Sequence, residues 1–179
     1  PLAAPGQGKS GGMNVYVGQI AKELSLRNVY VDIFTRSHDS HNKTINYFGD
    51  KVRIIHLPSG LLSDDKNSIY YSLPEFTCNL VKFIGEESLT YDLIHSHYWF
   101  SGRVAVVLAN QLNIPHLTVF HTLAETKKRA RVGEVEPEER LIGEKKIVKF
   151  TDSIIAFSRH EKEILIIWGL LGLGLLFMS

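Results

Sequence analysis

Residues 93–122 read LIHSHYWFSGRVAVVLANQLNIPHLTVFHT, and this stretch decides the expected fold. The short run at 93–96 predicts a β-strand, the apolar stretch at 102–111 predicts a short buried helix, and the β-branched run at 117–121 predicts a second strand. Two strands joined by a helix are typical of a parallel β-α-β unit. The stretch therefore predicts one unit of a parallel α/β sheet.

The same alternation continues on both sides of this stretch. Further strands are expected at 29–35, 52–57 and 153–157, and further helices at 13–27, 74–87 and 138–150. Strands alternating with helices predict an α/β fold with a Rossmann-like, doubly wound parallel sheet. Ligands of such sheets bind beyond the carboxyl ends of the strands, so functional side chains are expected directly after each strand.

Composition sets limits on the class of protein. A chain of 179 residues with 44% hydrophobic and 22% charged side chains is expected to fold as one domain. The formal net charge of +1 argues against broad electrostatic binding of nucleic acid. The single cysteine, Cys78, excludes an internal disulfide framework and fits a reducing, cytoplasmic compartment. We expect Cys78 to be a small buried apolar residue.

Both ends of the chain are interpreted as truncated. The chain opens on Pro1, and residues 164–178 read ILIIWGLLGLGLLFM, which is almost wholly apolar. This run is shorter than the roughly 20 apolar residues of a membrane-spanning helix, and it contains three glycines. We expect a domain at 1–163 and an aberrant tail at 164–179 that is not native domain sequence. Membrane contact is expected only if that tail is native.

A glycine-rich loop, PGQGKSGGMN at 5–14, runs into the first expected helix. Glycine allows close approach of a ligand to the backbone, and the N–H groups at a helix start attract phosphate. The Lys9–Ser10 pair precedes the Gly11–Gly12 pair, so the loop matches neither a Walker loop nor a dinucleotide fingerprint. The loop by itself leaves a phosphate cradle and a plain turn both open.

The stretch HSHYW at 95–99 follows the strand at 93–96. His95 and His97 lie two residues apart and point the same way, which suggests a metal pair. No third ligand follows at a regular spacing, so no metal site is expected, and a core role for one histidine remains open. Aromatic side chains in this stretch can pack on a sugar ring, and its histidine and tyrosine side chains can form hydrogen bonds. The stretch therefore predicts a sugar or phosphate pocket.

Six cations stand near these segments, and two of them are placed to bind an anion. Lys127 lies just past a strand end, beside His121 and Thr122. Arg140 opens a helix, where a cation opposes the helix dipole and is expected to serve a ligand anion instead. Solvated surface charge is the alternative for any one of the six: Lys66, Lys127, Lys128, Arg129, Arg131 and Arg140.

These segments in this order resemble glycosyltransferase family 4. Within that family they are similar to the enzymes that glycosylate inositol phosphate and to the sucrose and sucrose-phosphate synthases. The resemblance extends over nearly all of the chain before Leu165. It rests on PLAAPGQGKSGGMNVYV at 1–17, VDIFTR at 31–36, DLIHSHYWFSG at 92–102, HTLAETK at 121–127 and EPEERLIGEKKIVKFTDSIIAFSRHEKE at 136–163.

The resemblance implies the N-terminal, acceptor-side domain of a GT-B fold. The whole enzyme would be a retaining hexosyltransferase that needs no cofactor and uses a nucleoside diphosphate sugar, a UDP-sugar, as donor. Its acceptor would be a sugar phosphate or an inositol phosphate. Matched residue by residue, the resemblance assigns the active-site histidine to His97, the donor diphosphate to Gly11 and Gly12, and the acceptor to Lys9, Asn14, Lys66, Tyr98, Thr122, Lys127 and Arg140.

The chain departs from the family pattern at three points. The family has a central strand ahead of PLA, and its loss is expected to leave backbone groups without partners. Lys9–Ser10 stand where the inositol-phosphate enzymes have Asp-Ala, which leaves the acceptor open. The donor domain is missing, so this fragment alone is expected to be inactive.

Two other classes of function remain open from the sequence. One is a non-catalytic module that binds sugar phosphates, and the other is an inactive gene fragment. An NAD-type oxidoreductase is disfavoured because the glycine loop lacks the required spacing and the acidic partner of the ribose. The sequence does not indicate an oligomeric state.

Overall fold

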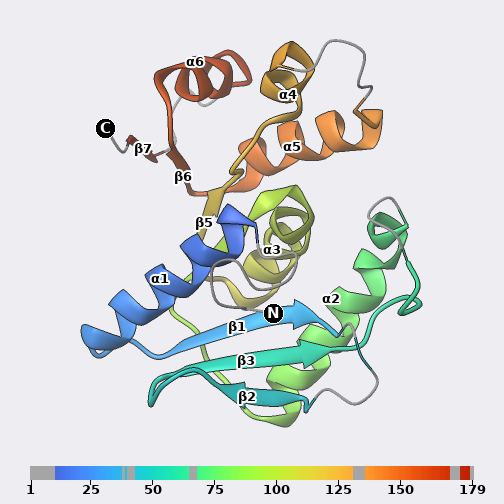
Figure 1. Cartoon of the computed structure of the whole chain (residues 1–179), viewed down its shortest axis with the longest axis vertical. Helices are drawn as coiled ribbons and strands as arrows, with labels where there is room; N and C mark the ends of the chain where they lie inside the picture. Colours follow the sequence, from blue (N-terminus) through green and yellow to red (C-terminus); the bar gives the residue numbers. More distant parts are fainter. Residues whose placement is uncertain are drawn as a thin grey trace. The chain divides into compact units, whose positions relative to one another are not determined.

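The structure is a computed structural model that describes residues 11–37, 39, 43–64, 68–130, 136–169 and 174–177; for residues 129, 130 and 174–177 it describes the backbone alone. It divides into two compact units, Pro1–Glu87 and Ser88–Ser179, and each is described here by itself. Figure 1 labels their helices and strands.

The first unit is a three-stranded sheet with two helices. Its sheet has the order β1-β3-β2, with β1 parallel and β2 antiparallel to β3 (Figure 1). The central strand carries the core, because Val52, Ile54, Ile55 and Leu57 are all buried. The elements are α1 (Gly12–Leu26), β1 (Val31–Arg36), β2 (Ile45–Tyr47), β3 (Val52–Leu57) and α2 (Ile69–Glu86).

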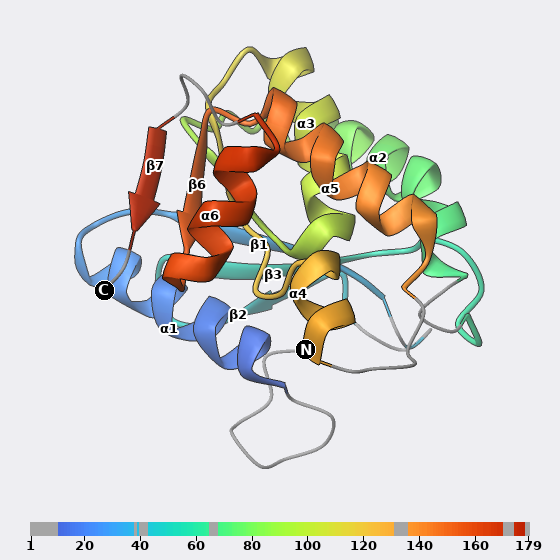
Figure 2. The same ribbon diagram turned by 90° about the horizontal axis from the view of Figure 1, so that it is seen from above.

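The second unit is a four-stranded parallel sheet of order β4-β5-β6-β7. Figure 2 shows β7 beside β6. Its core is formed by fully buried side chains from strand ends and from α5, including Val119, Phe120, Ile147 and Ile154. The elements are β4 (Ile94–His97), α3 (Tyr98–Leu112), β5 (His116–Val119), α4 (Ala124–Ala130), α5 (Glu138–Phe150), β6 (Ser153–Ala156), α6 (Arg159–Ile167) and β7 (Gly174–Phe177).

The expected α/β class with a parallel sheet is confirmed, and every expected strand and helix is present within a few residues. The expected start of α2 at Pro74 was wrong, because the helix already begins at Ile69 and Pro74 lies inside it. A proline there removes one backbone donor without ending the helix. The expected burial of Cys78 was also wrong, since it is exposed on α2. Four elements were not expected: β2, α4, α6 and β7.

The first strand of each unit lies at an edge of its sheet. Among the described strands, β1 pairs with β3 alone and β4 pairs with β5 alone. The resemblance predicts a central strand ahead of residue 1, and such a strand needs free edges to pair with. The other two edge strands of the described sheets are β2 and β7.

The apolar end of the chain takes part in the second unit. Residues 164–167 belong to α6, where Ile164 and Leu165 are buried, and residues 174–177 form β7 against β6. The expected boundary at 163 therefore lies inside a helix. None of the helices in the described ranges is long and apolar enough to span a membrane.

Close packing of α3 against α5 depends on two glycines. A Cβ atom added at Gly102 would lie 2.7 Å from Ile147 Cδ1 and 3.2–3.3 Å from its Cγ atoms, and one added at Gly143 would lie 3.0 Å from the Trp99 ring. Ile147 is fully buried and has little room to move. The glycines therefore set the distance between the two helices.

We predict that Gly102→Ala destabilises the chain, because overpacking a buried helix contact costs about 1–3 kcal/mol, and the better helix propensity of alanine offsets less than about 1 kcal/mol. Denaturant titration followed by circular dichroism measures this. Gly85→Ala is the matched control, since a Cβ atom there meets nothing within 4 Å. Equal stability of the two variants would contradict the packing argument.

Candidate functional site

The carboxyl ends of β4 and β5 carry two residues with left-handed backbone. Tyr98, directly after β4, has φ 74°, and His121, shortly after β5, has φ 61°. Residues other than glycine rarely adopt this conformation, and each case costs on the order of 1–3 kcal/mol. Such strain concentrates at functional sites. Two cases at the ends of adjacent parallel strands indicate a site at this sheet edge.

A serine hydroxyl holds the turn from β4 into α3. Ser101 Oγ accepts a hydrogen bond from His97 N at 2.9 Å, and it lies within donating distance of the carbonyl oxygens of His97 and Tyr98. The hydroxyl thus takes the place of backbone partners that a helix start lacks. This contact fixes the backbone that carries both His97 and Tyr98.

Three histidines with tilted ring contacts form a group at the same edge. His97 Nδ1 lies 3.2 Å from His121 Nε2, and the ring centroids of His95 and His97 are 4.2 Å apart. Burial, with the neighbouring histidines adding to it, lowers the pKa of His97 to about 3; burial and His121 lower the pKa of His95 to about 4. These rings are therefore neutral at pH 7 and act as hydrogen-bonding groups rather than as cations.

The three histidines contact one another through their rings. Within the described ranges, no group of three histidine, cysteine or acidic side chains is arranged to hold a metal ion. The rings of His95 and His97 lie against each other at a tilt of 42°, and His97 Nδ1 lies within hydrogen-bonding distance of His121 Nε2. A neutral hydrogen-bonding group at this position suits a sugar hydroxyl.

Arg140 is the centre of a buried ion cluster. Its side chain is 3% exposed, and Nε donates to Glu144 Oε1 at 2.8 Å while Nη1 donates to Glu136 Oε2 at 2.6 Å. Nη2 donates to the Thr122 carbonyl oxygen, and the guanidinium carbon lies 5.1 Å from the centre of the Tyr98 ring. One side chain therefore joins α5 to the residues that follow β4 and β5.

The two glutamates around Arg140 differ in their surroundings. Glu144 is fully buried and also accepts the Ala124 N–H, at 2.9 and 3.2 Å to its two oxygens. Burial raises the pKa of Glu144, opposed by the donors Ala124 and Arg140. Burial also raises the pKa of Glu136, but hydrogen bonds from Lys127 and Arg140 outweigh it and lower the pKa. Burial lowers the pKa of Arg140, but the charge of Glu144 outweighs burial, so the pKa of Arg140 is raised.

Lys127 completes the cluster from α4. Its ammonium group forms an ion pair with Glu136 Oε1, so Glu136 lies between two cations. The side chain of Lys127 is 29% exposed, whereas that of Arg140 is almost completely enclosed. Lys127 is therefore the cation of the pair that solvent reaches.

The second unit thus brings together the expected active-site histidine, His97, and four of the seven residues that the resemblance assigns to the acceptor. These four belong to the cluster and the turns beside it: Tyr98, Thr122, Lys127 and Arg140. Their individual roles remain predictions. Two further residues, Glu136 and Glu144, hold the cluster together. For Glu144 the available signal was its spacing of four residues from Arg140, because such residues share a helix face; Glu136 precedes the helix and gave no such signal.

Other predicted site residues belong to the first unit or fall outside the described ranges. Gly11 precedes α1 and accepts the Asn14 N–H at 3.0 Å, and Gly12 is the first residue of the helix. A Cβ atom at either glycine would meet nothing within 4 Å. The first turn of α1 contains no acidic residue, so the helix start keeps its attraction for anions. Lys9 and Lys66 lie outside the described residues.

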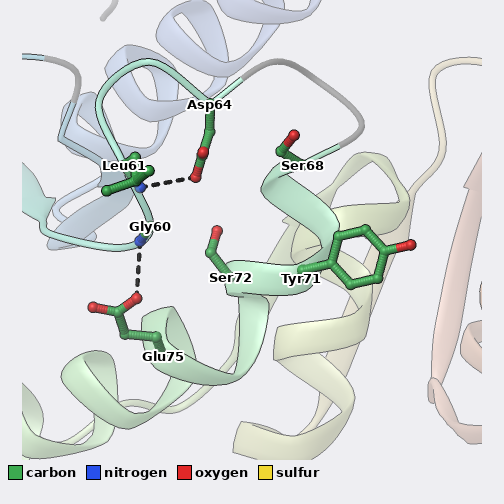
Figure 3. Close-up of a pocket in the computed structure, with 7 residues that line it drawn as sticks. All are labelled: Gly60, Leu61, Asp64, Ser68, Tyr71, Ser72 and Glu75. Carbon is green, nitrogen blue, oxygen red and sulfur yellow. Dashed lines mark hydrogen bonds between the residues drawn. The ribbon is translucent and has the colours of Figure 1, made fainter.

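The first unit also contains a shallow pocket, drawn in Figure 3, between Gly60 and the start of α2. Asp64 Oδ2 accepts the Leu61 N–H at 2.8 Å, and Glu75 Oε2 accepts the Gly60 N–H at 2.9 Å. Both carboxylates therefore stabilise the turn at Gly60, which has φ 60°. None of the seven described residues that line it is a cation.

A parallel α/β sheet with polar groups at its carboxyl edge defines a Rossmann-like ligand-binding domain. The chain matches the family model described as Glycosyltransferase Family 4 over residues 10–170, and it belongs to that family.

Similar curated proteins and a solved structure agree with this assignment. D-inositol 3-phosphate glycosyltransferases of Xylanimonas cellulosilytica and Corynebacterium jeikeium are 36% and 38% identical, each over 93% of this chain. The chain covers 41% and 40% of their lengths. The structure of sucrose-phosphate synthase from Thermosynechococcus elongatus matches 95% of this chain with a TM-score of 0.85 and 29% identity, over 43% of its own length. The fold is thus that of its N-terminal GT-B domain.

The buried histidines predict a loss of stability in mild acid. The folded pKa of His97 lies below its unfolded value, so the unfolded chain binds more protons between those values, and stability falls as pH falls. This histidine alone is expected to lower the unfolding free energy by about 1–2 kcal/mol as the pH falls from 6.5 to 5. We expect His97→Gln to show a shallower decline of the unfolding free energy over this range. A slope identical to that of the wild-type chain would refute the assignment.

Arg140 is expected to be essential for folding of the second unit. Arg140→Ala leaves Glu144 buried without its counter-ion, which costs about 3–5 kcal/mol. Arg159→Ala is the control, because that side chain is 89% exposed and lies 3.6 Å from Glu163; its effect should stay below about 0.5 kcal/mol. Thermal unfolding measures both. A stable Arg140→Ala variant would show that the cluster is not structural.

Proposed function

We propose that this chain is the acceptor-side domain of a retaining glycosyltransferase. The enzyme transfers a sugar from a nucleoside diphosphate sugar, a UDP-sugar, to a phosphorylated sugar or inositol. The observation that supports this most strongly is the group of Lys127, Arg140 and Tyr98 at the carboxyl edge of β4 and β5, in a chain of glycosyltransferase family 4. Cations and aromatic rings there suit an acceptor that has both a phosphate and a sugar-like ring.

The residues of the second unit divide the work of holding the acceptor. Lys127, the more exposed cation, and Arg140, the enclosed one, both contact the acceptor phosphate. The neutral ring of His97, oriented by His121, hydrogen-bonds a sugar hydroxyl. Holding the acceptor hydroxyl in one orientation lowers the entropy that the reaction has to lose.

The donor side is assigned to the start of α1. Gly11 and Gly12 present backbone N–H groups without a side chain in the way, and no acidic residue lies in the first turn. Such a helix start stabilises the charge that develops on a departing diphosphate. The remainder of the donor site would come from a second domain, since the chain covers 41% of the relative from Xylanimonas.

The relatives suggest which acceptors to test. The curated relatives carry the name D-inositol 3-phosphate glycosyltransferase, and the solved structure is a sucrose-phosphate synthase. Inositol phosphate and fructose 6-phosphate both combine a phosphate monoester with a ring of hydroxyl groups. The cluster around Lys127 suits this shared chemistry.

We predict that inositol 3-phosphate or fructose 6-phosphate raises the thermal unfolding midpoint of the chain, whereas inositol and fructose do not. A ligand at a hundredfold excess over its dissociation constant stabilises the folded state by about 2.7 kcal/mol. Lys127→Ala should abolish the shift. Lys128→Ala is the matched control, since this neighbour on α4 has the same charge and is exposed.

Arg140 is unsuitable for this test because its loss is expected to unfold the second unit. A cooperative transition that responds to neither sugar phosphate would contradict the proposed acceptor site. A shift that survives Lys127→Ala would place the phosphate elsewhere.

A further inference from the structure

The two cations assigned to the acceptor phosphate already share an internal anion. Glu136 Oε1 pairs with Lys127 Nζ, and Glu136 Oε2 accepts from Arg140 Nη1 at 2.6 Å. The Glu136 carboxylate is 8% exposed, and each of its oxygens serves one cation. A phosphate that is to contact both cations therefore meets a position that a carboxylate occupies.

Glu136 is the replaceable member of the cluster, and Glu144 is the permanent one. Glu144 lies within α5, is fully buried and also holds the Ala124 N–H at the start of α4. Glu136 precedes the helix, whose N-cap is Pro137. Its hydrogen bonds in the described part of the chain go to Lys127 and Arg140. Removal of Glu136 thus leaves Arg140 paired with Glu144.

A phosphate monoester has the chemistry to take the place of this carboxylate. It carries a charge of about −1.5 to −2 at pH 7 and three acceptor oxygens, where a carboxylate has one charge and two oxygens. It can bridge Lys127 and Arg140 and still accept a further hydrogen bond. A neutral sugar has no charge to offer the two cations in exchange for Glu136.

We propose that Glu136 is an internal competitor of the acceptor phosphate. Its carboxylate bridges Lys127 and Arg140 while the acceptor is absent and leaves them when a phosphate monoester binds. Glu136 is then a specificity-determining residue, because acceptors without a phosphate cannot displace it. This proposal rests on the proposed function, which places the acceptor phosphate at these two cations.

If Glu136 competes with the phosphate, the wild-type chain binds phosphate more weakly than a chain without the charge of Glu136. A charge-assisted hydrogen bond changes an equilibrium by about tenfold or more, and phosphate binding has to break such bonds to Glu136. A neutral amide at position 136 keeps the size and an acceptor oxygen but removes the competing charge. Phosphate should therefore bind more tightly to Glu136→Gln than to the wild-type chain.

The test measures dissociation constants of inorganic phosphate and fructose 6-phosphate by isothermal titration calorimetry. We expect Glu136→Gln to bind both about tenfold more tightly than the wild-type chain. Glu139→Gln is the matched control: it removes one negative charge from the exposed first turn of α5, and its affinity should change by less than about twofold. Glucose carries no phosphate, so Glu136→Gln should bind it no more tightly than the wild-type chain or Glu139→Gln.

The outcomes separate this proposal from the proposed function. If the wild-type chain binds phosphate and Glu136→Gln binds no more tightly than Glu139→Gln, Glu136 does not compete, although the phosphate site stands. If neither the wild-type chain nor Glu136→Gln binds phosphate, the acceptor site itself is wrong, and this proposal with it.

A second variant protects the test against a folding defect. Glu136→Asp keeps the charge but shortens the side chain by one methylene, so its carboxylate cannot bridge both cations as well. Its phosphate affinity should lie between those of the wild-type chain and Glu136→Gln. Should Glu136→Gln lose its cooperative unfolding transition, Glu136→Asp with wild-type affinity overturns the proposal, and tighter binding supports it.

Discussion

The side chain of Arg140 ties the second unit together. A guanidinium that is almost fully enclosed needs partners for its charge, and it finds them in Glu144, in Glu136 and in the carbonyl group of Thr122. Glu144 in turn holds the N–H of Ala124 at the start of α4. Helix α5, the turn after β5 and the start of α4 are therefore fixed to one another by a single set of charges, and the candidate site is built on that set.

Strain in the backbone complements this ion cluster. Tyr98 and His121 both have positive φ angles, and each lies directly beyond a parallel strand. The Ser101 hydroxyl and the contact between the Tyr98 ring and Arg140 stabilise the first of these turns. The strained backbone brings an aromatic face and neutral histidines to the same sheet edge as the cations. That combination suits a ligand with a ring of hydroxyl groups and an anion.

Much of the site could be located from the sequence, but the pairing of its charged side chains could not. The motifs around His97, Thr122 and Arg140 were found because polar residues follow predicted strands. From the sequence, Arg140 was expected to bind a ligand anion, whereas the structure shows it enclosed by two glutamates. Pairing of charges depends on which side chains become buried together, and burial is decided by the fold. Only the four-residue spacing of Arg140 and Glu144 on α5 indicated part of this pairing.

The sequence by itself determined the α/β class, the longer strands and the limits of α5, because hydrophobic periodicity over ten or more residues is a local property. It did not determine β2 and β7, which have three and four residues and exist through pairing with β3 and β6. It also misjudged Cys78, because residue type alone does not tell which face of α2 turns inward. Short strands, buried charges and left-handed turns depend on contacts between distant residues, so only the tertiary structure decided them.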